Sequence, residues 1–216
     1  MEFQGFSPET IDFLWGIRFN NNREWFEEHK KQYQTTLYEP MKALARDLFP
    51  DVQADFPELE CKVSRIYRDA RMHPPMPYKE SIWICFRTSD APWGEQPVFF
   101  FEVTSEDYSF GFLFWFPRTA QMEEFRHLLA ENPRPFTAIV DELERTTDLR
   151  LEGNTYRRPK PCPDAALERY YALKNFGVIV NRPIDERLYS PQLAEEISNC
   201  FASLKPLMRY CRNTLR

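Results

Sequence analysis

Residues 98–116, which form two predicted β-strands, constrain the fold more than any other feature of the sequence. The strands flank Ser105-Glu106-Asp107, a short run of polar residues, and are rich in the aromatic and β-branched residues typical of sheets. In the second strand, alternate positions from Phe110 to Phe116 are phenylalanine, and Leu113 and Trp115 occupy the other face. A strand that is apolar on both faces is typical of the interior of a sheet covered on both sides. The sequence therefore predicts an antiparallel hairpin within a covered sheet.

Predicted helices precede and follow this hairpin. Ser7-Pro8 and Ser190-Pro191 each place a capping residue before a proline, and the apolar residues that follow recur at helical spacing. The second N-terminal helix is expected to end before Pro50, with a loop over residues 51–60. We therefore expect a single α+β domain over residues 1–216, with a largely antiparallel sheet covered by helices from both ends of the chain. The strands predicted to build this sheet are residues 62–71, 79–88, 97–104 and 108–117, and a further short strand is predicted at 176–180.

The composition argues against several classes of protein. Hydrophobic residues make up 43% of the chain and aromatic residues 16%, which is enough for a substantial core and argues against disorder. The net charge of −5 argues against bulk binding to nucleic acid or to a membrane surface, and no apolar run is long enough to span a membrane. The five cysteines are an odd number without a C-x-x-C pair, and no secretory signal is present. We therefore expect reduced thiols, no disulfide and a cytoplasmic location.

The candidate site lies in residues 64–87, which hold more closely spaced polar groups than any other stretch. Three arginines within seven residues surround one aspartate, and the guanidinium group fits both phosphate and carboxylate. Three prolines in residues 73–77 stiffen the loop that follows and return the chain beside the arginines. We expect a partly open pocket that binds a small anionic ligand. Its predicted residues are Arg65, Arg68, Asp69, Arg71, Tyr78 and Lys79.

The convergence of these residues depends on local backbone geometry. Strict alternation along a strand places Arg68 on the face opposite Arg65 and Arg71, so convergence requires the strand to end or bulge near Asp69. If the site binds an anion, Arg68→Ala and Arg71→Ala are expected to abolish stabilisation by that anion while the fold stays intact.

Two functions remain open at this point. One is an anion-binding protein, with or without an enzymatic activity. The other is an interaction or scaffold domain in which the arginine cluster forms a structural network of ion pairs. Open access to at least two guanidinium groups favours the first, and saturated arginine–carboxylate pairs favour the second. The sequence indicates neither the identity of the ligand nor the oligomeric state.

The motif Arg65-x-x-Arg68-Asp69-x-Arg71 resembles the signature of a widespread, mostly bacterial family classed as a domain of unknown function. The similarity extends along nearly the whole chain, through Asn21–Phe26, Tyr108–Gly111 and Lys174–Phe176. Met72 stands where the family signature has phenylalanine, and the loop His73–Met76 is slightly short and lacks the family's acidic-or-Asn/Lys pair. The resemblance implies a single α+β domain and implies no activity.

No other motif predicts a reaction or a cofactor. The chain has no Walker loop, no Gly-x-Ser-x-Gly elbow and no zinc-spaced set of cysteines and histidines. Glu124-x-x-His127 is a single unit, whereas a di-iron site needs two such units and two further glutamates. We expect no cofactor and no bound metal. Basic pairs at Arg157-Arg158 and at Arg209/Arg212 are local, so nucleic acid is not the expected partner.

Overall fold

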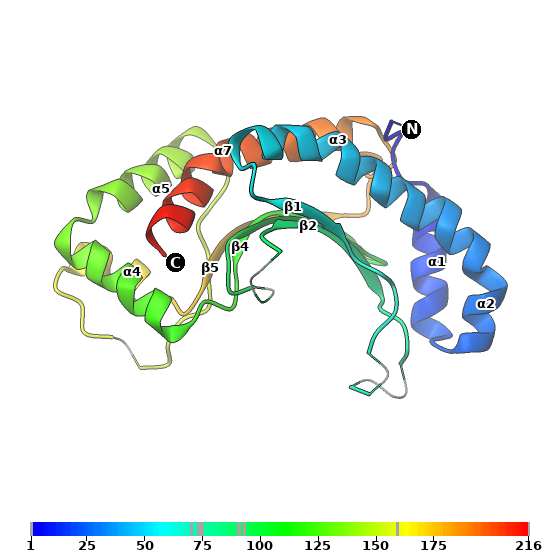
Figure 1. The fold of residues 1–216 in the computed structure, drawn as a ribbon, viewed down its shortest axis with the longest axis horizontal. Helices are drawn as coiled ribbons and strands as arrows, with labels where there is room; N and C mark the ends of the chain where they lie inside the picture. Colours follow the sequence, from blue (N-terminus) through cyan, green and yellow to red (C-terminus); the bar gives the residue numbers. More distant parts are fainter. Residues whose placement is uncertain are drawn as a thin grey trace. The chain divides into compact units, whose positions relative to one another are not determined.

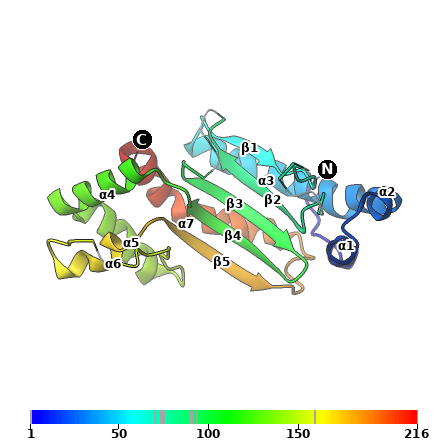
Figure 2. The same ribbon diagram turned by 90° about the horizontal axis from the view of Figure 1, so that it is seen from below.

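The computed structural model describes residues 2–69, 71–72, 76–89, 92, 94–158 and 160–215. Five strands form one antiparallel sheet in the order β1-β2-β3-β4-β5 (Figure 2). Together with the helices, this sheet confirms the expected α+β class. The sheet has one strand more than the four that were expected. The strands are β1 (Glu60–Val63), β2 (Ser81–Arg87), β3 (Val98–Thr104), β4 (Asp107–Phe114) and β5 (Phe176–Pro183).

Helices lie at both ends of the chain and between β4 and β5 (Figure 1). Within the described ranges, none of them is both long and apolar enough to cross a membrane. Two short irregular helices, η1 and η2, adjoin α3 and α6. The helical elements are α1 (Pro8–Phe19), α2 (Arg23–Gln32), the π-helix η1 (Tyr33–Tyr38), α3 (Glu39–Asp55), α4 (Thr119–Glu131), α5 (Arg134–Thr146), the 3-10 helix η2 (Ala165–Leu167), α6 (Glu168–Tyr171) and α7 (Gln192–Thr214).

Helix α1 begins where the sequence predicts, whereas α3 ends later than predicted. Ser7 caps α1 with Pro8 in its first turn, and the Asn22 side chain accepts a hydrogen bond from the Trp25 N–H at the start of α2. The expected end before Pro50 is wrong, because α3 continues through this proline to Asp55. Pro50 removes one backbone donor, but the buried side chains on both sides of it, Leu48 and Val52, keep the same helix face packed.

The chain divides into two compact units. Unit 1 comprises Met1–Phe86, Phe100–Phe110 and Asn181–Asn199. Unit 2 comprises Arg87–Phe99, Gly111–Val180 and Cys200–Arg216. The expectation of a single domain over residues 1–216 remains a prediction.

In unit 1, one face of the sheet is packed and the opposite face is polar. Phe86 of β2 stacks on Phe49 of α3, and Phe101 of β3 stacks on Phe6. On the opposite face, the Ser81 hydroxyl donates to Glu102 Oε1 at 2.6 Å, and both residues are only half-buried. This polar face of β2 and β3 carries the candidate site.

In unit 2, an aromatic core forms around Phe176 of β5. The Phe176 ring lies 5.2 Å from the Phe125 ring of α4 and 5.9 Å from the Phe136 ring of α5. Phe112 and Phe114 of β4 are fully buried on the same side, whereas Leu113 on the other face is half-buried. The second face of β4, for which the sequence also predicts a cover, is therefore less buried than the first at Leu113.

Candidate functional site

The segment that joins β1 to β2 leaves the regular ladder early. The Ser64 N–H donates to the Trp83 carbonyl at 2.8 Å, but the Ser64 hydroxyl, rather than a backbone carbonyl, accepts from the Trp83 N–H at 3.0 Å. The expected strand over residues 62–71 is therefore wrong in length, since β1 ends at Val63 and only an isolated bridge joins Tyr67 to Tyr78. The break lies before Arg65, earlier than the bulge expected near Asp69. Strict alternation consequently does not govern where the arginine side chains lie.

Tyr78 belongs to the core of unit 1. Only 4% of the residue is exposed, and its ring stacks on Phe26 of α2 at 4.3 Å between centroids. The Asn21 side chain accepts from the Tyr78 N–H and donates to the Tyr78 carbonyl, both at 3.0 Å. Tyr78 therefore anchors the returning chain against α2, and its ring does not face the polar side of the sheet.

Lys79, the next residue, lies among other cations. Its Nζ donates to the Arg65 carbonyl at 2.8 Å and lies 5.5 Å from the centre of the Trp83 ring. Burial lowers the pKa of Lys79, and the positive charges of Lys62, Arg65 and Arg68 lower it further. Glu102 opposes this shift more weakly. We call Lys62, Arg65, Arg68 and Lys79 the cation cluster.

The positive charges of the cation cluster are not neutralised by ion pairs with described carboxylates. Among the described residues, no carboxylate forms an ion pair with any of its four members. Lys62 and Arg65 are exposed, and Arg68 is half-buried. Four like charges therefore lie close together on one surface without an ion-pair partner among the described residues, with Glu102 near Lys79 and Glu80 in the pocket that Arg68 helps to line.

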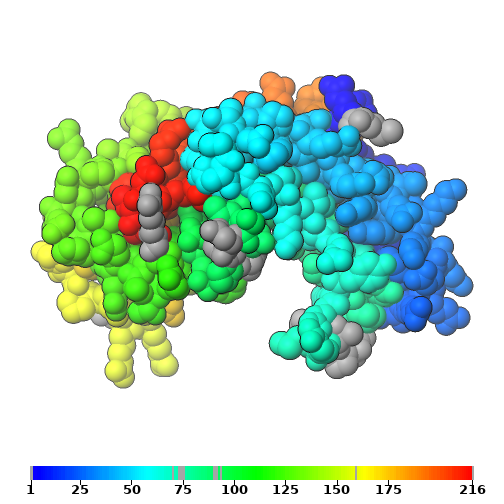
Figure 3. Space-filling model, viewed as in Figure 1, coloured from blue at the N-terminus to red at the C-terminus, as the bar shows by residue number. Residues whose placement is uncertain are grey.

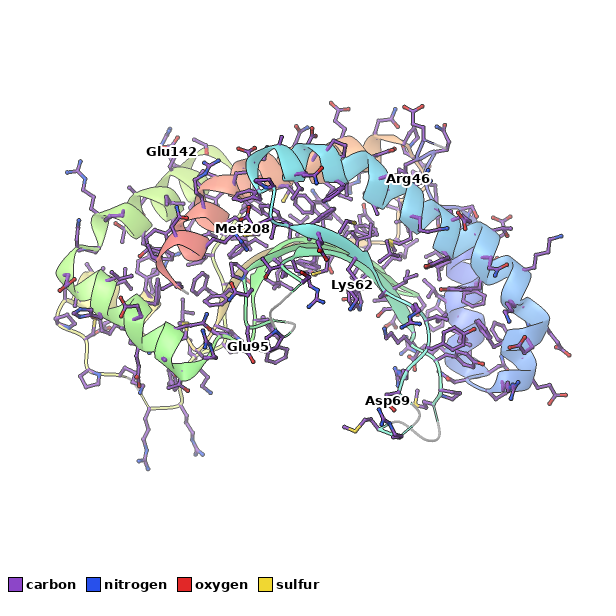
Figure 4. All side chains as sticks on the ribbon, viewed as in Figure 1. Arg46, Lys62, Asp69, Glu95, Glu142 and Met208 are labelled. Carbon is purple, nitrogen blue, oxygen red and sulfur yellow. The ribbon has the colours of Figure 1, made fainter. Side chains whose placement is uncertain are left out.

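Asp69 and Arg71 form a separate pair. Arg71 Nε donates to Asp69 Oδ1 at 3.0 Å and Arg71 Nη2 donates to Asp69 Oδ2 at 2.7 Å, a bidentate contact. The Arg71 side chain is 88% exposed. The loop that bears this pair stands out from the rest of unit 1 in the space-filling view (Figure 3), and Asp69 lies near its tip, away from Lys62 on β1 (Figure 4).

A polar pocket of about 330 Å³ adjoins the cation cluster and shares Arg68 with it. Arg18 of α1 lies inside this pocket, with Nε 3.7 Å from Glu80 Oε2 and Nη1 3.0 Å from Glu106 Oε2. The turn between β3 and β4 forms one wall. The eight residues that line the polar pocket are Arg18, Arg68, Glu80, Ser81, Thr104, Ser105, Glu106 and Asp107.

A family model described as "Conserved hypothetical protein (DUF2461)" matches residues 9–210. The chain belongs to the DUF2461 family. This membership confirms the family resemblance inferred from the sequence. No curated protein matches the chain. The DUF2461 description states neither a reaction nor a ligand, so function has to be argued from the site itself.

In this DUF2461 chain, the six residues predicted for the site divide into three groups. Arg65, Arg68 and Lys79 lie together in the cation cluster. Asp69 and Arg71 pair with each other on the loop, and Tyr78 is buried against α2. Whether the six bind a ligand remains a prediction. The loop prolines at positions 74 and 75 and His73 lie outside the described residues.

Sequence reasoning missed Lys62 and most of the polar pocket. Lys62 follows from the alternation of β1, in which Cys61 and Val63 face α3 and Lys62 points the other way. Arg18 carries no local signal, because its contacts with Glu80 and Glu106 join residues that are far apart in the sequence. Across the part of the chain that the structure describes, no three or more His, Cys, Asp or Glu side chains are placed so that they could hold a metal ion.

Proposed function

We propose that the cation cluster binds a small anion, a phosphate or a carboxylate. The observation that carries this proposal is the gathering of four cations with no carboxylate partner among the described residues. Like charges held this close repel one another, and the pKa of Lys79 is lowered by burial first and by that repulsion second. A bound anion relieves the repulsion and accepts charge-assisted hydrogen bonds of about 1.5–3 kcal/mol each.

Each candidate residue has a role in this proposal. Arg65 and Arg68 supply guanidinium donors, and Lys79 supplies an ammonium group next to them. Asp69 holds Arg71 in the separate pair on the loop, and Tyr78 fixes the backbone that carries Lys79. We assign no reaction, because no histidine or cysteine of the described residues lines the polar pocket or belongs to the cation cluster.

The alternative is an interaction or scaffold domain in which the arginine cluster is a structural network of ion pairs. The bidentate Asp69–Arg71 pair is the arrangement that this alternative predicts, but it is exposed and involves neither Arg65 nor Arg68. A saturated network would require carboxylates at those two arginines as well. We further propose that the protein acts in the cytoplasm, on the basis of its odd number of cysteines.

A thermal-shift titration with inorganic phosphate and with acetate tests the proposal. The wild-type protein is expected to gain thermal stability with at least one of the two anions, and Arg68→Ala is expected to abolish that gain. Arg46→Ala is the matched control, because Arg46 is an exposed arginine of the same unit on α3, away from the cation cluster (Figure 4). Stabilisation that survives Arg68→Ala places the site elsewhere. Failure of Arg68→Ala to fold, with Arg46→Ala intact, supports the structural network.

A further inference from the structure

The polar pocket next to the cation cluster is lined by carboxylate oxygens that have unused hydrogen-bonding capacity. Arg18 engages Oε2 of Glu80 and Oε2 of Glu106, and the Thr104 hydroxyl donates to Asp107 Oδ1 at 2.7 Å. The remaining carboxylate oxygens, Oε1 of both glutamates and Oδ2 of Asp107, receive no hydrogen bond from the described residues. The pocket lining therefore presents acceptors to whatever enters it.

Two of the three hydroxyl groups of the lining, those of Ser81 and Thr104, already donate to the protein. The Ser81 hydroxyl donates to Glu102, and the Thr104 hydroxyl accepts from the backbone N–H groups of Glu106 and Asp107. Ser105 Oγ lies 3.4 Å from Arg18 Nη1 and accepts from it. For a ligand that only accepts hydrogen bonds, the side-chain donors of the lining are the Ser105 hydroxyl and the guanidinium groups of Arg18 and Arg68.

The charges of the pocket complement those of the cation cluster. Three carboxylates and two guanidinium groups line the pocket, which leaves one negative charge in excess. The neighbouring cation cluster is positive and contributes Arg68 to both sites. A molecule that reaches from Arg68 into the pocket therefore meets positive charge at one end and acceptors with excess negative charge at the other.

We propose that the ligand of this site is a small zwitterion, with an anionic group at the cation cluster and a protonated amine in the polar pocket. An ammonium group offers three donors and a positive charge, which matches the free carboxylate oxygens of Glu80, Glu106 and Asp107. The volume of about 330 Å³ accommodates a small molecule. This inference rests on the proposed anion site and adds the chemistry of the ligand's second group.

Three phosphate monoesters separate the contributions of the two ends. Ethyl phosphate carries the anion alone, phosphoethanolamine adds an ammonium group, and glycerol phosphate adds hydroxyl groups instead. Calorimetric titration of the full chain is expected to give phosphoethanolamine at least about tenfold tighter binding than ethyl phosphate, equivalent to about 1.4 kcal/mol. Glycerol phosphate is expected to bind with an affinity close to that of ethyl phosphate.

Variants of the pocket carboxylates complete the test. Glu106→Gln and Glu80→Gln each remove one negative charge without changing side-chain size. The ratio of the affinity for phosphoethanolamine to that for ethyl phosphate is therefore expected to fall towards one in both variants. Glu131→Gln, an exposed carboxylate on α4, is the control and is expected to leave it unchanged. A preference that survives both pocket variants, or glycerol phosphate binding as tightly as phosphoethanolamine, overturns the zwitterion. Absence of ethyl phosphate binding instead overturns the anion site itself, and the zwitterion with it.

Discussion

Removing the buried guanidinium of Arg126 is expected to destabilise unit 2 strongly. This residue of α4 is only 8% exposed, and its Nε and Nη2 donate to the carbonyls of Tyr171 at 3.1 Å and Leu173 at 2.7 Å. Nη1 donates to the Met122 carbonyl, which lies on the same helix. The guanidinium also lies 5.0 Å from the centre of the Tyr156 ring. Arg126 thus joins α4 to the segment before β5.

The size of the expected loss of stability follows from the buried hydrogen-bond acceptors that Arg126→Met leaves without a donor. The Met122 carbonyl keeps its place in the helix, but the carbonyls of Tyr171 and Leu173 lose their donor. An unsatisfied buried acceptor costs about 1–3 kcal/mol, and the lost cation–π contact adds about 0.5–1 kcal/mol. Release of the guanidinium from a buried site offsets part of this cost. We expect a net loss of about 3 kcal/mol in the free energy of unfolding.

Arg150 provides a matched control for Arg126. Its Nη1 donates to three backbone carbonyls, those of Glu144, Thr147 and Leu149, but the residue is exposed. Water can replace those bonds, so Arg150→Met is expected to cost less than about 1 kcal/mol. Urea unfolding of both variants gives the two losses in the free energy of unfolding. The comparison requires that the dependence of this free energy on urea concentration has the same slope in both variants as in the wild type. Equal losses in the two variants would refute the reasoning, since burial would then have no effect.

Three further predictions concern single positions. Gly111→Ala is expected to cost about 3 kcal/mol or more in calorimetric unfolding, because φ is +144° and the new methyl group would lie 2.1 Å from the Val178 carbonyl oxygen; an unchanged melting temperature contradicts this. Because the pKa of Lys79 is lowered in the folded state, the unfolded chain holds the ammonium proton of Lys79 more tightly, so the stability of the wild type relative to Lys79→Met is expected to rise with pH between that lowered pKa and 10.5. A stability difference that falls with pH over this range would contradict the prediction. Of the five thiols, Cys162 is expected to react fastest with a thiol reagent near pH 8, because burial raises the pKa of Cys61 to about 12 and the other three are buried; fast labelling of a second thiol argues against it.

The sequence predicted the fold well where local patterns act alone. The alternation of phenylalanines in β4 and the Ser105–Asp107 turn identified the hairpin, and Ser7 identified the start of α1. It failed where a side chain replaced a backbone group, as at Ser64, whose hydroxyl ends β1. No periodicity signals such a replacement, because it depends on the position of a neighbouring strand.

The candidate site was predictable from the sequence only where its residues are close together in the chain. Arg65, Arg68 and Lys79 lie in one short stretch of the sequence, and the density of polar groups in that stretch was enough to identify them. The polar pocket joins Arg18 to the turn near Glu106, and only the tertiary structure brings those two together. Likewise, the Glu-x-x-His segment of α4 drew attention to metal ligands, whereas the residue within it that makes long-range contacts is Arg126.

Calorimetric titration of inorganic phosphate into the wild-type protein and into the double variant Arg68→Gln/Lys79→Gln tests the central claim most directly. The cation cluster is expected to bind one phosphate per chain, and loss of two charge-assisted partners is expected to weaken binding at least about 100-fold, while the melting temperature without phosphate stays close to that of the wild type. Equal binding by a folded double variant would contradict the account. Absence of phosphate binding by the wild type, together with unfolding of the double variant, would show that these cations serve the fold instead.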